Sequence, residues 1–379
     1  MKLLRMALKG FRNIEKADLS FSPGVNVIFG ANAQGKTNLL EAIWLLGGSK
    51  SFRGARESQM VSFGGRVFQL EGEFSDRERI QKILYTGGEK KKVLLNGVPL
   101  AGASSLRGEF FSVVFTPEDL SLIKDGPEQR RDFLDVAIGG VKPVYSRYLA
   151  QYQNLLDQRN ALLREISFSG RGREMLELWD SQLSKAGTAI SILRSDYLRR
   201  LGTAAKEIYS GFSGSREEFS LSYRSSVFGE EPLSVYSDQL ISRYAQALRD
   251  SVETDIKMRF TGKGVHRDDL EILIDGVSAK SFGSQGQQRS GAVALKLGEA
   301  AILKQVTGED PIILLDDVMS ELDASRQDYI LNRVKNFQVF LTCCDLSHTQ
   351  GLKEGRIFRA ENGSFSPAED LLSKKPEKE

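Results

Sequence analysis

Residues 30–40 of the chain read GANAQGKTNLL, and this stretch decides the fold. Two glycines stand five positions apart, and a lysine and a threonine follow the second one, so the stretch matches the phosphate-binding pattern G-x-x-x-x-G-K-[ST] at every specified position. The apolar run VNVIFG before it predicts a buried strand, and the apolar residues after Lys36 recur at helical spacing. This order of strand, loop and helix distinguishes a phosphate-binding loop from a glycine turn that only caps a helix.

The loop is predicted to bind the phosphates of a nucleotide. Small residues allow consecutive backbone N–H groups to surround the β-phosphate, and the start of the following helix adds positive potential. Lys36 is predicted to neutralise β- and γ-phosphate oxygens and to take part in catalysis, and the Thr37 hydroxyl is predicted to ligate Mg²⁺. The predicted cofactors are therefore ATP and Mg²⁺. The predicted nucleotide contacts in this loop are Gly30, Ala31, Asn32, Ala33, Gln34, Gly35, Lys36 and Thr37.

A second acidic anchor for Mg²⁺ is predicted at residues 312–317, which read IILLDD. Four apolar residues indicate a buried strand that ends in two carboxylates. Asp316 is predicted to hold Mg²⁺ through a water molecule, because this ion keeps several of its waters in proteins. Asp317 is predicted to be the catalytic group that orients or deprotonates the attacking water. The alternative is a strand end with two solvated aspartates.

A third element is the stretch SFGSQGQQRS at residues 281–290. Ser284, Gly286 and Gln287 open a predicted helix, and a helix N-terminus presents free N–H groups that suit a phosphate. These three residues are therefore predicted to contact a nucleotide. The alternative is a serine N-cap followed by a glutamine-rich solvent face.

The composition is that of an ordinary globular protein. The chain has 379 residues, 40% of them hydrophobic and 27% charged, which is more than one average domain. A net charge of +2 excludes attraction of the whole molecule to nucleic acid, so any DNA contact must be a local patch. The adjacent Cys343 and Cys344 indicate a reducing compartment, and the apolar runs are far shorter than the ~20 residues that cross a bilayer. We expect a cytoplasmic protein that does not enter the membrane.

The chain is predicted to have a discontinuous α/β lobe with a helical insertion. Strand patterns fill most of the first 115 residues, and alternating helix and strand patterns after residue 285 predict a parallel sheet. Helical periodicity at 145–166 and 175–212 predicts two long helices that pack as an antiparallel pair, with a third at 234–252. The predicted division is an ATPase lobe of residues 1–125 and 260–365, a helical lobe of 126–259 and a flexible tail of 366–379.

The order of these motifs resembles the head domains of ABC-type and SMC-type ATPases. The stretches GFRNIEKADLSFSPGVNVIFGANAQGKTNLLEAIWLL, KSFR, VVFTPEDL, GVHRDDL, SFGSQGQQR and LLDDVMSELD are similar still more closely to the RecF family of bacterial DNA repair proteins. This resemblance implies an α/β P-loop ATPase head of the ABC/SMC type with an inserted helical lobe. It also implies an ATP-dependent homodimer, in which Ser284 and Gly286 of one protomer close on the nucleotide held by Lys36 and Thr37 of the other.

The same resemblance implies a function in recombinational repair. Members of the family bind double-stranded DNA, with a preference for gaps and junctions, and work with RecR and RecO to help load the recombinase RecA. The expected activity is a weak, DNA-stimulated ATPase that serves as a switch. Two alternatives are a nucleotide-binding subunit of an ABC-type transporter without a DNA role and a small-molecule P-loop kinase, which would leave SQGQQ without a task.

The chain departs from the wider ABC pattern at three positions. Asp317 stands where transporter ATPases have a catalytic glutamate, and Thr342 stands where they have a switch histidine. A shorter base and a weaker hydrogen-bond donor to the γ-phosphate both predict slow hydrolysis. No glutamine occurs at the expected position in VVFTPEDL, where Glu118 is the candidate replacement.

Several basic groups are candidates for DNA contact, and for each group a solvated surface is the alternative. The candidates after the loop helix are Lys50, Arg53 and Arg56. Further candidates are Lys90, Lys91 and Lys92 at a predicted hairpin tip, and Arg159, Arg164, Arg171, Arg173, Arg199 and Arg200 on the predicted helical pair. The stretch HRDD at 266–269 is either a metal or acid/base set or, as we favour, a structural corner made of ion pairs.

Overall fold

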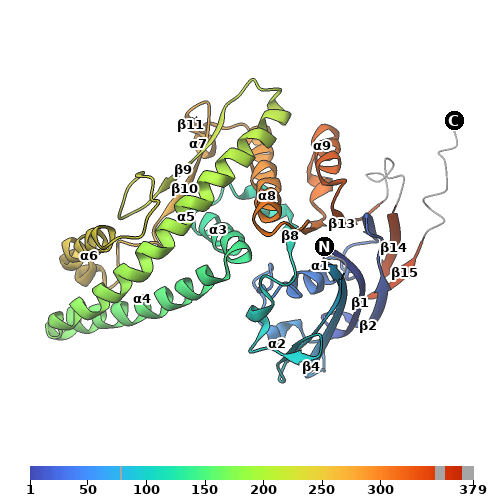
Figure 1. The fold of residues 1–379 in the computed structure, drawn as a ribbon, viewed down its shortest axis with the longest axis horizontal. Coiled ribbons are helices and arrows are strands. Elements are labelled where there is room, and N and C mark those ends of the chain that lie inside the picture. The colour runs from blue at the N-terminus through green and yellow to red at the C-terminus, as the bar shows by residue number, and fades with distance from the viewer. Residues whose placement is uncertain (77–78, 346–354, 369–379) are drawn as a thin grey trace. The chain divides into compact units, whose positions relative to one another are not determined.

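The structure is a computed structural model that describes residues 1–76, 79–345 and 355–368 (Figure 1). The chain divides into two compact units. Unit 1 comprises Met1–Leu120 and Glu299–Glu379, and unit 2 comprises Ser121–Gly298. The division predicted from the sequence cuts the chain at other points and stays a prediction.

The first sheet of unit 1 is mostly parallel. Its strand order is β15-β14-β3-β13-β12-β8, in which the five strands from β14 to β8 run parallel and β15 is antiparallel. All residues of β12 and β13 are buried, as expected for parallel strands that read as continuous apolar runs. The parallel arrangement brings the carboxyl ends of β3, β13, β12 and β8 to one edge. The bounds are β3 Val25–Phe29, β8 Ser112–Phe115, β12 Ile312–Asp316, β13 Gln338–Cys343, β14 Gly355–Glu361 and β15 Ser364–Pro367.

The last strand overlaps the predicted flexible tail. β15 includes residues 366 and 367, and the Ala368 N–H donates to the Ile357 carbonyl, so these residues contact β14; the flexibility of the tail stays a prediction. The tail from residue 369 onward lies outside the described residues.

The second sheet of unit 1 is antiparallel, with the order β2-β1-β4-β5-β6-β7. Helix α1, Lys36–Leu45, shares a hydrophobic core with residues of both sheets. Its buried Leu39, Leu40 and Ile43 confirm the helical periodicity seen after the glycine loop. The bounds are β1 Lys2–Phe11, β2 Ile14–Ser20, β4 Val67–Asp76, β5 Arg79–Gly88, β6 Lys92–Leu95 and β7 Val98–Pro99.

Short helical segments complete unit 1. The four-residue helix α2 is Glu57–Met60, and α9 is Ala324–Val334. The 3-10 segments are η1 Ala103–Leu106, η2 Pro117–Ser121 and η4 Val318–Glu321. Helix α8, Gln285–Thr307, begins in unit 2 and ends in unit 1.

Unit 2 contains the predicted antiparallel helix pair. Helix α4, Pro143–Ser169, and helix α5, Leu176–Ser213, pack along each other (Figure 1). Hydrogen bonds join Arg159 to Asp180 near one end of the pair and Tyr145 to Arg194 near the other, so the two helices run in opposite directions. The predicted third helix is α6, Asp238–Met258, which starts and ends a few residues later than its periodicity indicated.

The longest elements of unit 2 that were not predicted are a helix and a strand. Helix α3, Pro127–Val141, begins with a proline in its first turn, and strand β9, Phe219–Arg224, pairs with β10 in the three-stranded sheet β11-β10-β9. The remaining elements are η3 Arg173–Met175, β10 Asp269–Ile274, β11 Val277–Ser278 and α7 Ala279–Phe282.

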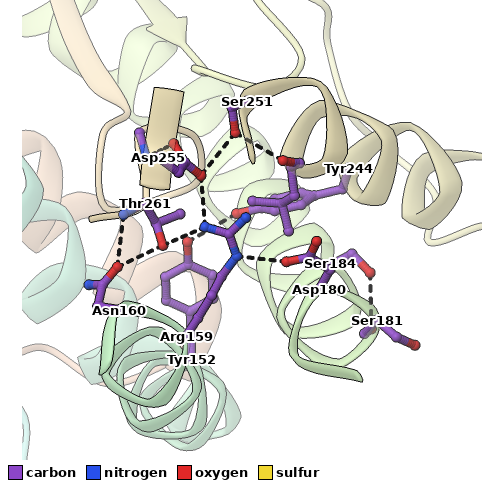
Figure 2. A network of polar contacts seen from close by, with 12 residues as sticks. Tyr152, Arg159, Asn160, Asp180, Ser181, Ser184, Tyr244, Ser251, Asp255 and Thr261 are labelled. Atoms are coloured by element: carbon purple, nitrogen blue, oxygen red, sulfur yellow. Dashed lines mark hydrogen bonds and ion pairs between the residues drawn. The ribbon is translucent and has the colours of Figure 1, made fainter. Parts of the chain in front are cut away.

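A buried polar network around Arg159 joins the helices of unit 2 (Figure 2). The Arg159 side chain is fully buried, and it forms ion pairs with Asp180 of α5 at 2.6 Å and with Asp255 of α6 at 2.7 Å. Its guanidinium also donates to the Thr261 hydroxyl at 2.9 Å. Arg159 cannot contact DNA from this position, so its inclusion among the DNA-contact candidates was wrong. Buried charges must be paired, and here the pairing ties α4, α5 and the turn after α6 together.

Candidate nucleotide site

The loop between β3 and α1 has the backbone that its glycines predict. Gly30 has φ +154° and Gly35 has φ +102°, both in the region that glycine adopts most easily. A Cβ atom added at Gly30 would lie 2.4 Å from the Ala360 carbonyl oxygen, so the loop passes against β14 where a side chain does not fit. Ala31, Asn32 and Ala33 are exposed, which leaves the middle of the loop open to a ligand.

Lys36 and Thr37 lie at the start of α1, where Lys36 contacts the loop and Thr37 contacts the carboxyl end of β12. The Lys36 ammonium is buried and donates to the carbonyl oxygens of Gly30, at 2.6 Å, and Ala31, at 3.0 Å. The Thr37 hydroxyl donates to Asp316 Oδ1 at 2.9 Å. The structure therefore brings together the loop and the acidic strand end, which are 279 residues apart in the chain. A hydroxyl and a carboxylate oxygen are ligands that Mg²⁺ takes, so these two side chains fit the ion.

The two aspartates at the end of β12 have different environments. Asp316 is buried, whereas Asp317 is half-buried and has φ +52°, an uncommon conformation for a residue other than glycine. The side chain of Thr342, from the neighbouring strand β13, bonds to both residues: it donates to Asp316 Oδ1 at 2.9 Å and accepts the Asp317 N–H at 2.8 Å. The Ser320 hydroxyl donates to the Asp317 carbonyl at 2.7 Å. Thr342 and Ser320 thus hold the turn that places the two carboxylates.

This finding changes the expectation for Thr342. The sequence suggested that its hydroxyl would hydrogen-bond a γ-phosphate, but in the structure its only proton is donated to Asp316. A threonine has one hydroxyl hydrogen, so this bond uses its whole capacity to donate. Thr342 is placed to orient the acidic pair. The partner was not predictable from the position alone, because it depends on the register between β12 and β13.

The electrostatics of Asp316 favour a nearby cation. Burial raises the pKa of the Asp316 carboxyl, the charges of Asp317 and Glu118 act in the same direction, and the bonds from Thr37 and Thr342 oppose them. A cation at this edge would favour the charged form of the carboxyl. Glu118 lies in η2, directly after β8, so it stands at the same sheet edge as the acidic pair. The suggestion that it replaces a glutamine of the wider pattern stays a prediction.

Two further residues next to the loop were not found from the sequence. The Asn13 side chain, in the turn between β1 and β2, donates to the Ala33 carbonyl at 3.3 Å and accepts from the Asn38 side chain at 2.8 Å. The Cys344 thiol lies 3.7 Å from Lys36 Nζ and donates to Asn32 Oδ1 at 3.2 Å. Asn13 lies in the turn between β1 and β2 and Cys344 directly follows β13, so both residues meet the loop only in the folded chain, and no local pattern signals them. Cys343 and Cys344 are both free thiols.

Ser284 lies at the N-terminus of α8, as predicted. Its hydroxyl accepts the Gln287 N–H at 3.2 Å, and the Gln287 side chain accepts the Ser284 N–H at 2.7 Å, so the two residues cap the helix reciprocally. The Gln287 amide also donates to Glu217 at 2.9 Å. Ser284 is exposed, and because its hydroxyl oxygen only accepts in this cap, its O–H can still donate a hydrogen bond to a ligand. Ser284, Gly286 and Gln287 belong to unit 2 and the glycine loop to unit 1, and their contact with one nucleotide stays a prediction.

Several of the remaining DNA-contact candidates are exposed. Lys50, Arg53 and Arg56 are exposed, and Arg53 donates to the side chain of Asn38, two residues after Lys36. On the helical pair, Arg173 forms an exposed ion pair with Glu253. The remaining arginines in this region are Arg164 and Arg171, which are exposed, and Arg199 and Arg200, which both pair with Asp196.

Residues 266–269 make structural contacts, in line with the favoured interpretation. His266 bonds to the Tyr152 hydroxyl at 2.8 Å and to the Thr261 carbonyl at 2.9 Å, and burial lowers the pKa of its imidazole to about 4. Asp269 pairs with Arg130 at 2.8 Å. In the part of the chain that the structure describes, no group of three or more His, Cys, Asp or Glu side chains is placed to hold a metal ion.

With this geometry established, similarity to known proteins identifies the family. Residues 2–363 match the RecF/RecN/SMC N terminal domain. The chain is 37% identical over 367 residues to the DNA replication and repair protein RecF of Acetivibrio thermocellus, which covers 96% of this chain and 99% of that protein. It is 40% identical over 372 residues to RecF of Heliobacterium modesticaldum, which covers 97% and 99%. The chain belongs to the RecF family.

Solved structures agree with this assignment. A structure described as the recombination mediator protein RecF-ATPrS in the RecFOR pathway matches with a TM-score of 0.90 at 36% identity, covering 96% of this chain and 97% of that one. An Smc head domain from Pyrococcus furiosus matches with a TM-score of 0.54 at 16% identity, which shows a shared fold only. The fold is that of an ABC/SMC-type ATPase head, and the comparisons do not favour a transporter subunit. No helix among the described residues has the length and apolar character needed to span a bilayer.

Proposed function

We propose that this RecF-family chain is an ATP-dependent DNA-binding protein of recombinational repair and replication restart. The observation that carries the proposal is the 2.9 Å bond between Thr37 and Asp316 beside the glycine loop, in a family whose relatives are named DNA replication and repair proteins. A related RecF structure is described with ATP, and its sequence is 37% identical to this chain. ATP binding would drive two protomers together on DNA, and slow hydrolysis would release them.

In this proposal, different residues of unit 1 bind the triphosphate, hold Mg²⁺ and activate the attacking water. The loop N–H groups and Lys36 would bind the β- and γ-phosphates, and Thr37 and Asp316 would hold Mg²⁺, which neutralises charge on the phosphate oxygens. Asp317 would orient the attacking water and accept its proton. Its left-handed backbone is held by Thr342 and Ser320, so the carboxylate is presented from a fixed turn.

The same geometry supports the proposal that turnover is slow. Asp317 is one methylene shorter than the glutamate of transporter ATPases, so it would hold its water less closely. Thr342 donates its only proton to Asp316 and gives none to a phosphate in this arrangement. We therefore expect hydrolysis to time the dissociation of the dimer. Lys36→Arg should weaken ATP-dependent dimerisation, and Asp317→Asn should bind ATP and keep the dimer closed. Light scattering that finds the same mass with and without ATP would refute the switch.

Closure across the dimer can be tested by complementation. In the proposed dimer, Ser284 of one protomer caps the nucleotide held by Lys36 of its partner. The variants Lys36→Ala and Ser284→Arg should each lose most ATP hydrolysis. When the two variants are mixed, the heterodimer should regain one intact site, made of the unchanged Lys36 of one chain and the unchanged Ser284 of the other. Activity that does not rise on mixing would place both residues in the same protomer's site or in no common site.

The DNA role needs a separate test. Lys50, Arg53 and Arg56 are proposed to contact phosphates, and the preferred DNA is proposed to be a gapped or junction-containing duplex. RecR, RecO and, downstream, RecA are proposed partners because of the family resemblance, and the description of the matching structures in the RecFOR pathway supports the first two. Duplex DNA should raise the ATPase rate, and a gel shift should require ATP. A rate that no DNA changes, together with no shift, would favour an ATPase without a DNA role.

A further inference from the structure

An exposed phenylalanine stands in a short anchored loop of unit 1. Phe63 is the residue with the most exposed large apolar side chain among those described, at 108% of its reference area. Its loop is closed by a bond from the Gly65 N–H to the Ser62 carbonyl at 2.9 Å, and the Ser62 N–H donates to the Gly10 carbonyl of β1 at 2.9 Å. The ring is therefore presented to solvent from a loop whose base is held on the second sheet.

The same loop is attached to the tip of a basic hairpin. The Glu89 N–H donates to the Arg66 carbonyl at 3.0 Å, and a Cβ atom added at Gly88 would lie 2.5 Å from that oxygen, so the two segments touch through their backbones. Lys91 pairs at 3.0 Å with Glu57 of α2, and Glu57 also accepts the Tyr85 hydroxyl at 3.1 Å. These bonds unite the loop, the hairpin tip and α2 into one surface. We call it the Phe63 surface, and it consists of Arg56, Phe63, Arg66, Lys90, Lys91 and Lys92.

The charges of this surface suit phosphate groups. Arg66, Lys90 and Lys92 are exposed, and none of them has an ion-pair partner within residues 1–75, 79–345 and 355–368. Proteins that bind unpaired nucleic acid combine such a basic surface with an aromatic ring on which a base stacks. In a continuous duplex each base is already stacked between its neighbours. A ring like that of Phe63 therefore meets a free base face only at a gap, an end or a junction.

We propose that the Phe63 surface binds DNA where a duplex meets a single strand, with its lysines and arginines on phosphates and Phe63 stacked on the base at the boundary. The inference rests on the proposed DNA-binding function and adds to it the residue that selects the DNA structure. Basic groups alone hold any phosphate backbone equally. Selection of a gap thus falls to the ring.

Affinity measurements on paired DNAs test the inference. Binding of the full chain with ATP to a gapped duplex and to an intact duplex of equal length is followed by fluorescence anisotropy. Phe63→Ala should lower the affinity for the gapped DNA by roughly 5- to 150-fold, the loss of one stacked base, and leave the intact duplex unchanged. Phe63→Tyr keeps a stacking ring and should behave like the unsubstituted chain. A Lys90→Ala and Lys92→Ala double variant should weaken both complexes and lower the salt slope by about two.

Each outcome separates this inference from the proposed function. Unchanged gapped-DNA affinity in Phe63→Ala, while the unsubstituted chain binds, would overturn the inference and leave the function standing. Equal losses on both DNAs would also overturn it, since the ring would then act without selecting the boundary. If Phe63→Ala instead altered only the mass of the ATP-bound dimer, the surface would be a contact between copies of the chain. Failure of the unsubstituted chain to bind any DNA would overturn the function itself.

Discussion

Replacing Arg159 with methionine should destabilise unit 2 strongly, although no nucleotide or DNA contact is lost. Methionine keeps most of the side-chain volume but removes two buried ion pairs, and it leaves the carboxylates of Asp180 and Asp255 without their cation. Breaking a buried pair from one side costs about 3 to 5 kcal/mol, because the remaining charge stays desolvated. We expect a loss of that size in the free energy of unfolding near neutral pH.

The loss should depend on pH in a defined direction. Burial already raises the pKa of the Asp180 carboxyl, and the Arg159 charge opposes this rise. Without Arg159 the pKa rises further, so the folded variant binds more protons than the unfolded chain over a wider range. The stability of the Arg159→Met variant therefore increases as pH falls. The difference in unfolding free energy between this variant and the unsubstituted chain should be smaller near about pH 5 than near about pH 8.

The assay uses an intrinsic reporter beside the network. Trp179 precedes Asp180 on α5 and is partly buried, whereas the other tryptophan, Trp44, lies in unit 1. In a Trp44→Phe background, urea unfolding followed by tryptophan emission reports unit 2 alone. Arg173→Met is the matched control, because it removes an exposed ion pair with Glu253 and should cost no more than about 1 kcal/mol.

Two results would refute this reasoning. One is a loss of unfolding free energy for Arg159→Met that is no larger than the loss for Arg173→Met. The other is a loss for Arg159→Met that does not change with pH. A triple variant in which Asp180 and Asp255 also become asparagine should recover much of the stability, since no unpaired charge remains buried. Without that recovery, the loss would come from packing.

Three further predictions concern the site and its supports. Thr342→Val should lower ATP turnover about tenfold or more with little change in ATP affinity, because the hydroxyl that orients Asp316 and Asp317 is lost. Thr342→Ser keeps this hydroxyl and should restore turnover. Equal turnover rates for the two variants would contradict this role. Burial lowers the pKa of His266 to about 4, so the neutral imidazole contributes stability that is fully present above pH ~6.5 and is lost as pH falls toward 4, by up to about 3 kcal/mol. In urea titrations, the difference in unfolding free energy between the unsubstituted chain and a His266→Asn variant should therefore shrink from pH ~6.5 to about 4. A difference that stays constant over this pH range would contradict the prediction. Gly30→Ala should abolish binding of a fluorescent ATP analogue, because the added methyl group would lie 2.4 Å from the Ala360 carbonyl oxygen. Gly54→Ala is the control and should bind the analogue normally, because a methyl group added there has no other atom within 4 Å. Equal binding by both variants would show that the loop tolerates a side chain at Gly30.

The features that could be predicted from the sequence are those encoded within a few neighbouring residues. The glycine loop, the acidic strand end and the helix cap at Ser284 each depend on a contiguous pattern, and the long amphipathic helices depend on a regular period. The parallel sheet could be predicted because helix and strand patterns alternate in the last third of the chain.

The features that could not be predicted depend on register and on distant segments. The bonds of Thr342 need the pairing of β12 with β13, and the contact of Asn13 needs the turn after β1 to meet the loop. Arg159 was misassigned although a local signal existed. It lies at helical spacing from the buried Tyr152, Leu156 and Leu163, on the face that packs inward, where a charged residue indicates a buried pair.

The strand order of the first sheet has a consequence for synthesis on the ribosome. β3 carries the glycine loop, yet its two neighbours are β13 and β14, which emerge more than 300 residues later. Unit 2 is one continuous segment, so its helices can pack while that last part is still being translated. The nascent chain therefore exposes an unpaired apolar strand for most of its elongation, and its nucleotide site is completed only when the final strands arrive.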